Sequence, residues 1–336
     1  MCSARWASLV LSIGVVIAAA PRRAAADPTP ITPQLAYAYG ENETPRAAGM
    51  GGALRSLGNS TSAIFLNPAA MAETRVYHVE GLAQVSPEAR RQVYGGVVSD
   101  SVTGRLAGSI AVVGGFIDGD GFDRSFLDAR LALAYPITER LFIGLTGKYA
   151  RIYQEGTLGA GSAGGLGESA ASGGLRDPDD TDGGYLPIVD EFSFDAGLVL
   201  KVSDSVYLSA VGQNLTYPGN GLLPTTVGGG VGIGTTDFSI EADALADFSS
   251  YLSTSMRLMV GGEYLVGNHV PIRLGYRFDQ GAGEHSLSGG LGYVGNEFAI
   301  EGSVRRALAD PGATTIFIGL SYHLDAAGLT RSPAEL

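Results

Sequence analysis

Hydrophobic and polar residues alternate along most of the chain from about residue 75 onward. The pattern is clearest near the C-terminus, where one face of segment 270–279 carries Val270, Ile272, Leu274, Tyr276 and Phe278. The opposite face carries Pro271, Arg273, Gly275, Arg277 and Asp279. Segments 127–135, 298–305 and 314–324 alternate in the same way. A period of two over such lengths predicts β-strands with two chemically different faces.

The alternation predicts about fourteen strands of roughly ten residues each, a length that suits a membrane-crossing strand. We expect them at 75–85, 89–99, 104–115, 127–136, 140–152, 191–202, 205–214, 225–235, 237–246, 255–266, 269–279, 284–294, 296–305 and 313–324. Bacterial single-chain barrels have an even number of strands. The fold class predicted for 75–324 is therefore all-β, a transmembrane antiparallel β-barrel.

The connections between these strands support a barrel independently. From the second strand onward, short and long connections alternate. The short ones are 99–103, 137–139, 203–204, 235–236, 267–268 and residue 295. The long ones are 116–126, 153–190, 215–224, 247–254, 280–283 and 306–312. Outer-membrane barrels have short periplasmic turns and longer outer loops, so both chain ends are expected on the periplasmic side.

The less apolar face of the strands carries charges of both signs. They are Asp128, Arg130, Lys148, Asp195, Glu241, Asp243, Arg257, Glu263, Arg273, Arg277, Glu301 and Arg305. Facing lipid, such a charge would cost a few kcal/mol near the bilayer centre, so these side chains are expected to face the lumen. Two roles stay open for them: selectivity in transport, or a mutually neutralised filling.

Composition agrees with a barrel and excludes other classes. Hydrophobic residues make up 45%, charged residues 17%, and mean hydropathy is +0.15. After residue 20 there is no apolar run of about 18 residues, which argues against a helical membrane protein. The net charge of −12 argues against a nucleic-acid partner.

Residues 1–26 are typical of a secretory signal. Arg5 supplies the positive region, Trp6 to Ala20 the apolar core, and Ala24 to Ala26 a small-residue cleavage site before Asp27. A retained N-terminal anchor is the alternative, although the apolar run is short for a membrane span. The single cysteine, Cys2, lies within this segment at the wrong end for a lipoprotein, so the processed chain is expected to lack cysteine.

Residues 27–74, called here the hatch, do not alternate, and from the residues alone we expect a small, compact, partly apolar segment that could pack anywhere. They contain Arg46-Ala-Ala-Gly-Met-Gly-Gly-Ala53, followed by Ser62-Ala-Ile-Phe-Leu-Asn-Pro-Ala69. This pair of motifs resembles the N-terminal signature of the FadL superfamily, which includes long-chain fatty-acid transporters and shorter PorV/PorQ-like proteins. The segments Gly261–Tyr264 and Ile272–Arg277 are similar to a strand pair of the PorV-like branch, which the short chain length also favours.

The resemblance implies a fourteen-stranded barrel closed by an N-terminal hatch, and transport of a hydrophobic ligand that leaves sideways at a kinked strand. Asn67, Pro68 and Ala69 would lie in the hatch and take part in gating. Gly114 and Gly115 are candidates for the kink, because glycine weakens strand pairing, although an ordinary approach to the next loop explains them as well. The tail 325–336 departs from barrels that end on an aromatic residue.

The sequence gives little support for a catalytic, metal or dinucleotide site. His78, His269, His285 and His323 share no metal-ligand spacing. The glycines of 228–234 lie inside a predicted strand, where a dinucleotide site is not expected. Two acidic stretches, 118–123 and 177–182, suit calcium or simply a solvated loop. We expect no catalytic residue, no cofactor and no metal.

Three functions remain open at this point. The first is an outer-membrane channel of a Gram-negative bacterium, with membrane lipid and a hydrophobic or amphipathic small molecule as partners. The second is a PorV-like barrel that receives or anchors secreted proteins at the cell surface. The third is a structural barrel without a transport role.

Overall fold

The computed structural model describes residues 42–117, 124–154, 186–218, 223–250, 253–267, 269–308 and 312–323. The predicted signal, the first part of the predicted hatch (27–41), both acidic stretches and the tail lie outside the described residues.

Fourteen strands follow one another along the chain. They are β1 (Tyr77–Ser86), β2 (Arg91–Asp100), β3 (Ala107–Ile117), β4 (Arg124–Pro136), β5 (Leu141–Gln154), β6 (Leu186–Lys201), β7 (Val206–Gln213), β8 (Thr226–Gly234), β9 (Phe238–Asp247), β10 (Ser255–Val266), β11 (Val270–Asp279), β12 (Glu284–Val294), β13 (Phe298–Ala307) and β14 (Thr314–His323). The predicted strand order is confirmed. The largest difference is that β6 begins at Leu186 instead of residue 191.

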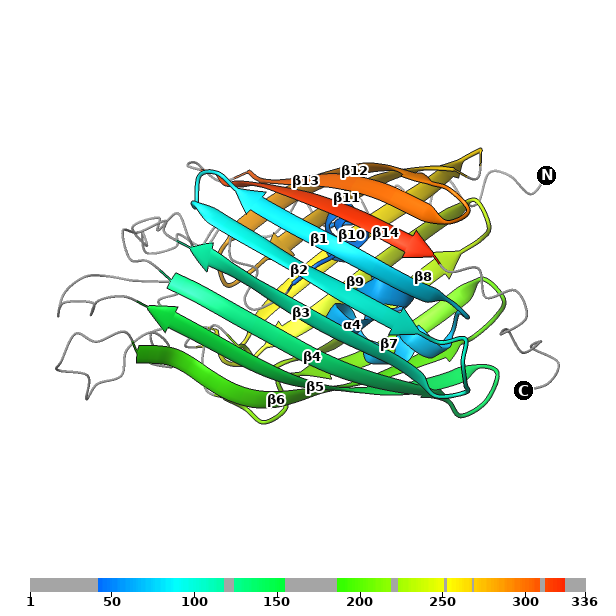
Figure 1. Cartoon of the computed structure of the whole chain (residues 1–336), viewed down its shortest axis with the longest axis horizontal. Helices are drawn as coiled ribbons and strands as arrows, with labels where there is room; N and C mark the ends of the chain where they lie inside the picture. The colour runs from blue at the N-terminus through cyan, green and yellow to red at the C-terminus, as the bar shows by residue number, and fades with distance from the viewer. Residues whose placement is uncertain are drawn as a thin grey trace.

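The strands close into one antiparallel barrel (Figure 1). Each strand pairs with its sequence neighbours, and β1 pairs with β14, where His78 lies opposite His323. The connections after β4, β6, β8 and β12 all lie at one end of the barrel, here called the short-turn end. Because the strands are antiparallel, β1 starts and β14 finishes at this same end.

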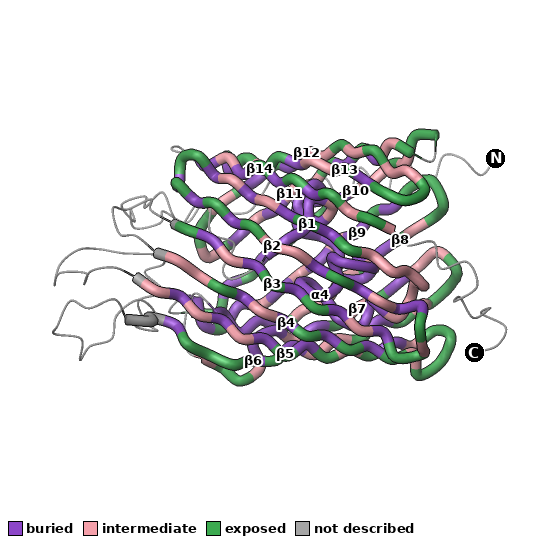
Figure 2. Tube along the Cα trace, viewed as in Figure 1, coloured by how far each residue is buried: buried purple, intermediate pink, exposed green. Residues whose placement is uncertain are grey.

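Burial alternates along each strand, as Figure 2 shows. The predicted outer faces are confirmed: Leu274 is 71% exposed, and Leu131, Ile300 and Leu320 also point outward. Their neighbours in sequence, such as Arg130 and Arg273, are buried inside. Within the described ranges, no helix has the length and apolar character needed to cross a membrane.

The described part of the hatch, 42–74, lies inside the barrel. It contains the helix α3 (Pro45–Gly49), the 3-10 helix η2 (Ser60–Ser62), the helix α4 (Ala63–Leu66) and the 3-10 helix η3 (Pro68–Ala72). Two of these helices begin with a polar cap followed by proline. The side chain of Thr44 accepts a hydrogen bond from the Ala47 amide, and that of Asn67 accepts one from the Ala69 amide. Proline suits the first helical position because that amide needs no partner.

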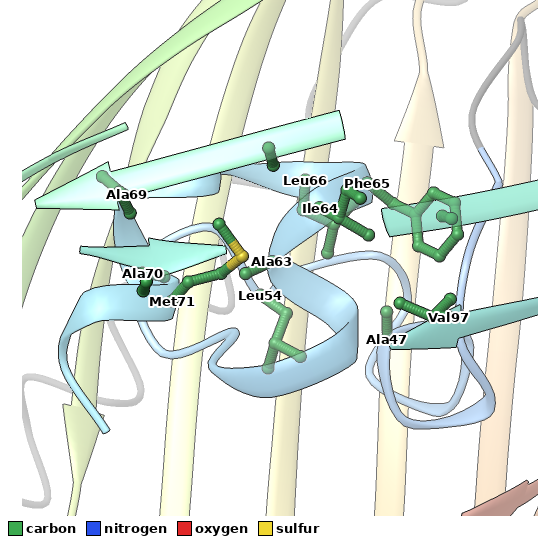
Figure 3. Packing of buried hydrophobic residues seen from close by; sticks show 14 of the residues in the cluster. Ala47, Leu54, Ala63, Ile64, Phe65, Leu66, Ala69, Ala70, Met71 and Val97 are labelled. Carbon is green, nitrogen blue, oxygen red and sulfur yellow. The ribbon is translucent and has the colours of Figure 1, made fainter. Parts of the chain in front are cut away.

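The hatch has one strongly apolar side. Residues of α4 and η3 pack against small and branched side chains on the inner faces of β1 to β7 (Figure 3). We call these inner faces the apolar wall, and its buried members are Leu82, Val93, Val97, Ala107, Ala111, Val113, Ala132, Ala134, Phe142, Val199 and Tyr207. This cluster is the main hydrophobic core among the described residues.

Glycines on the inner faces of several strands let the hatch backbone lie directly on the barrel. A Cβ atom on Gly261 or Gly275 would collide with the backbone of Met50 and Gly51, and one on Gly144 with the backbone of Ala69. Gly51 itself has a φ of +71°, a conformation that glycine adopts without a steric penalty. The abundance of glycine in these strands is thus explained in part by docking of the hatch.

Candidate functional site

The second side of the hatch is held by charges. Glu43, just before α3, is buried and pairs with Arg277 on β11 and Arg305 on β13. The Ser303 hydroxyl on β13 donates to the Pro45 carbonyl. We call the inner faces of β9 to β13 the anchor wall, because most ion pairs between barrel and hatch lie there.

A chain of alternating charges continues across the anchor wall. The Arg46 guanidinium of α3 lies 2.9 Å from a Glu263 carboxylate oxygen, and Glu263 also pairs with Arg273. Arg273 in turn pairs with Glu301. Burial of Arg46 opposes its charge, but the Glu263 carboxylate prevails and raises the pKa of Arg46 above its ordinary value. On this side, the hatch therefore docks on the barrel through charged side chains.

Two carboxylates on β9 bind the hatch backbone directly. One Asp243 oxygen accepts hydrogen bonds from the amides of Leu54 (3.0 Å) and Arg55 (3.2 Å), and from the Arg55 guanidinium (3.2 Å). Glu241 accepts from the amides of Ser56 and Leu57. Arg55 and Asp243 have side chains with no exposed surface. These carboxylates satisfy amides that no helix or strand of the hatch could satisfy.

The other predicted lumen charges pair with each other along the barrel wall. Asp128 with Arg130 and Lys148 with Asp195 form ion pairs of 2.7 and 2.9 Å, and Arg257 pairs with Asp247 at 2.8 Å. The Asn42 amide nitrogen donates to Asp128, which ties the start of the described hatch to β4. All twelve charges that the sequence analysis assigned to the lumen lie inside the barrel, most of them in ion pairs.

The predicted gate residues occupy two separate places. Asn67 is fully buried, donates to the carbonyls of Arg55 (2.8 Å) and Leu198 (3.3 Å), and lies against Gly197 of β6. Gly114 and Gly115 lie in β3, and both keep strand partners on β2 and on β4. The ladder is continuous there, so a sideways exit at this point would require these pairs to open. The register shift found in the ladders lies between β5 and β6, at Ile152 and Tyr153.

A cavity of about 650 Å³ opens below the hatch at the short-turn end, and we call it the vestibule. Hatch residues from Arg46 to Ser62 form its inner surface, and the turns at 204–205 and 235–237 form part of its rim. Six described carboxylates and two guanidinium groups line it: Glu73, Glu80, Asp204, Asp237, Glu263, Glu301, Arg46 and Arg273. It is a polar, water-accessible space with an excess of negative charge.

Sequence reasoning missed two vestibule residues, His78 and His323. They are far apart in the chain, but they face each other across the β1–β14 seam. Metal-ligand spacings cannot detect such a pair. The detectable signal was positional, because a closed barrel places the start of its first strand beside the finish of its last.

Comparisons with known proteins agree on the fold. No family model and no curated protein sequence matches the chain. The solved structure of the CymD monoaromatic hydrocarbon channel has a TM-score of 0.64 and 14% identity, covering 84% of this chain and 97% of that one. The Ralstonia pickettii toluene transporter TbuX has a TM-score of 0.58 and 14% identity, covering 84% and 98%. A Pseudomonas aeruginosa FadL homologue has a TM-score of 0.57 and 15% identity, covering 84% and 98%. At such identities, the likeness shows the fold.

Proposed function

We propose that this chain is a member of the FadL superfamily and works as a passive outer-membrane channel for hydrophobic or amphipathic small molecules. The hatch is its gate, and no catalytic step is assigned to it. The similar solved structures include a monoaromatic hydrocarbon channel and a toluene transporter, which makes toluene the first solute to test. No observation favours a barrel that receives secreted proteins.

The outer surface supports a membrane location. Large apolar side chains such as Leu131, Leu274, Leu291 and Leu320 point outward from strands that each pair with two neighbours in a closed barrel. In hydrocarbon, unpaired backbone groups and exposed charges carry a large penalty, and this arrangement avoids both. The secretory signal predicted at 1–26 supports export.

The observation that carries the channel is the difference between the two sides of the hatch. Contacts on the anchor wall are directional ion pairs and charge-assisted hydrogen bonds, which a hydrophobic solute cannot replace. Most contacts on the apolar wall are dispersion and hydrophobic contacts, which such a solute can replace without exposing apolar surface to water. The hydrogen bonds on this side are few: Asn67 donates to the Leu198 carbonyl, and the Phe65 carbonyl accepts from Arg130 and Gln213. The passage therefore lies between the apolar wall and the α4–η3 side of the hatch.

Two disulfides, one on each side of the hatch, test this arrangement. A Cβ atom on Gly197 would lie 3.0 Å from the Asn67 Cγ position, and a Cβ on Gly49 would lie 2.8 Å from Ser303 Oγ. Both separations suit a cysteine pair. The first pair, Asn67→Cys with Gly197→Cys, locks the hatch to the apolar wall. The second pair, Gly49→Cys with Ser303→Cys, locks it to the anchor wall. Cys2 is the only native cysteine, so the processed chain offers no competing thiol.

We expect oxidation of the first pair to abolish toluene uptake into proteoliposomes, and reduction to restore it. The oxidised second pair should keep the uptake of the wild-type chain. The four single-cysteine variants control for the substitutions themselves. If both locks stopped uptake, the hatch would have to leave as a whole and the passage would lie elsewhere. Equal uptake with the first lock closed would exclude gating by the hatch.

A further inference from the structure

The two vestibule histidines are register partners on neighbouring strands. His78 of β1 lies directly opposite His323 of β14, and both side chains line the vestibule. Side chains directly opposite each other on antiparallel strands have Cβ atoms about 4.5–5.5 Å apart. The ring centroids are 4.0 Å apart and the rings are nearly perpendicular, at 87°. The strands thus hold two imidazoles face to edge at the closing seam of the barrel.

The hydrogen bonds of the pair leave two nitrogen atoms facing each other. His78 Nδ1 is hydrogen-bonded to the Ser60 hydroxyl of the hatch, and His323 Nε2 lies 3.4 Å from Ser321 Oγ. The remaining nitrogens, His78 Nε2 and His323 Nδ1, are hydrogen-bonded to each other, so a proton lies between them. When the outer nitrogens donate their hydrogens to the serines, both inner nitrogens carry lone pairs. Two facing lone pairs repel unless a proton or a cation lies between them.

We propose that His78 and His323 form an open binding site for a late first-row divalent metal ion such as Cu²⁺, Ni²⁺ or Zn²⁺. Imidazole is a preferred ligand of these ions, at about 2.0–2.1 Å for Zn²⁺. A ligating histidine commonly donates its other ring N–H to an acceptor, which is the part played here by Ser60 and Ser321. Ser60 is therefore a positioning residue.

The surroundings suit a cation. Of the described vestibule side chains, six are carboxylates and two are guanidinium groups, an excess of four negative charges. Such a cavity raises the local concentration of cations. Within the described parts of the chain, no group of three or more His, Cys, Asp or Glu side chains could hold a metal, so water would complete the coordination. The site would be open to the vestibule, and it does not depend on the transport function proposed above.

The test is Cu²⁺ binding to the processed full-length chain in detergent, carrying no histidine tag and monitored by electron paramagnetic resonance. We expect one tightly bound Cu²⁺ per chain with a spectrum showing two ligating nitrogens. Either His78→Asn or His323→Asn should weaken binding by more than ~10-fold and remove one nitrogen from the spectrum. His269→Asn and His285→Asn are matched controls that should leave both readouts unchanged.

Ser60→Gly separates positioning from ligation. Ser60 has a φ of +60°, so glycine removes the hydroxyl without adding backbone strain. We expect Cu²⁺ to bind about tenfold more weakly with both nitrogens still in the spectrum. Circular dichroism of each variant establishes that the barrel is folded. If folded His78→Asn/His323→Asn bound Cu²⁺ like the wild-type chain, binding would be adventitious and the proposal would be overturned. A wild-type chain that binds no Cu²⁺ would overturn it as well.

Discussion

The interaction between Asp243 and the hatch offers the sharpest test of the anchor wall. Asp243 on β9 accepts hydrogen bonds from two hatch amides and from the Arg55 guanidinium. Both side chains of this ion pair are fully buried. Asp243→Ala removes all three acceptor contacts and leaves the hatch covalently intact. The barrel strands keep their own hydrogen bonds, so the effect should be confined to docking of the hatch.

The size of the effect follows from burial. Removing one partner of a buried ion pair costs about 3–5 kcal/mol, and part of this is the orphaned amides of Leu54 and Arg55. At about 1.4 kcal/mol per factor of ten, the opening equilibrium of this hatch segment should rise roughly 100- to 4000-fold. Asp243→Asn keeps one carbonyl acceptor and loses the charge, so it should have an intermediate effect.

Hydrogen exchange measured by mass spectrometry reports this equilibrium segment by segment. We expect peptides covering 54–57 to exchange roughly 100- to 4000-fold faster in Asp243→Ala, while peptides from β3 and β12 keep the wild-type rate. Glu88→Ala is the matched control, because Glu88 pairs with Arg306 on the exposed surface and does not contact the hatch. Exposed pairs contribute little, so this variant should leave hatch exchange unchanged.

Two outcomes would refute the reasoning. Unchanged exchange at 54–57 in Asp243→Ala would mean that the β9 carboxylate does not hold the hatch. Equal acceleration in the hatch and in the strands would mean that hatch and barrel open together, so that the two walls cannot act separately.

Two further substitutions test the docking of the hatch on β11 and the position of the barrel in the membrane. Gly275→Val places a side chain where the backbone of Met50 and Gly51 now lies, so trypsin should cut the hatch at Arg46 or Arg55 faster than in the wild-type chain. Gly81→Val is the control, because its side chain meets open space and should not change the cleavage rate. Equal cleavage rates in the two variants would contradict direct docking of the hatch on Gly275. Leu274→Arg puts a charge at a 71%-exposed outward position in the middle of β11 and should destabilise the barrel in lipid by ~2–4 kcal/mol. Phe238→Arg, at the start of β9, should cost only ~0–1 kcal/mol, and denaturant unfolding in vesicles measures both effects. Equal effects would contradict the assigned membrane depth.

Strand positions and faces were predictable from the sequence because a barrel repeats one simple requirement. Each strand must place an apolar side chain outside and a polar or small one inside at every second residue, as Leu274 and Arg273 do. One error of register would invert every side chain of a strand, so the period of two is a strong signal. The inward position of the charges followed from the same argument.

The docking of the hatch was not predictable in this way. Glu241 and Asp243 were identified as lumen charges, but their partners are backbone amides of residues 54–57, which carry no sequence signal. Gly275 alternates like any inward residue, and only the structure shows that the hatch backbone lies on it. Gly114 and Gly115 were candidates for a kink or for an ordinary approach to the next loop, and their strand pairing is continuous. Glycine in a strand indicates either that another backbone approaches closely or that the strand is irregular, and the sequence alone does not distinguish the two.

In the proposed channel, the two unlike walls would let the hatch open and close again in the same position. If ion pairs surrounded the hatch on all sides, any movement would expose several buried charges at once, each a loss of several kcal/mol. If apolar contacts surrounded it, a hydrophobic solute could displace it entirely, since one apolar contact replaces another. With Glu43 and residues 54–57 fixed to the anchor wall, α4 and η3 can separate from the apolar wall and return to the same place. In the proposed channel, the solute itself would cover the apolar surface that the movement uncovers, so opening would be favoured by a hydrophobic molecule and disfavoured when only water is available.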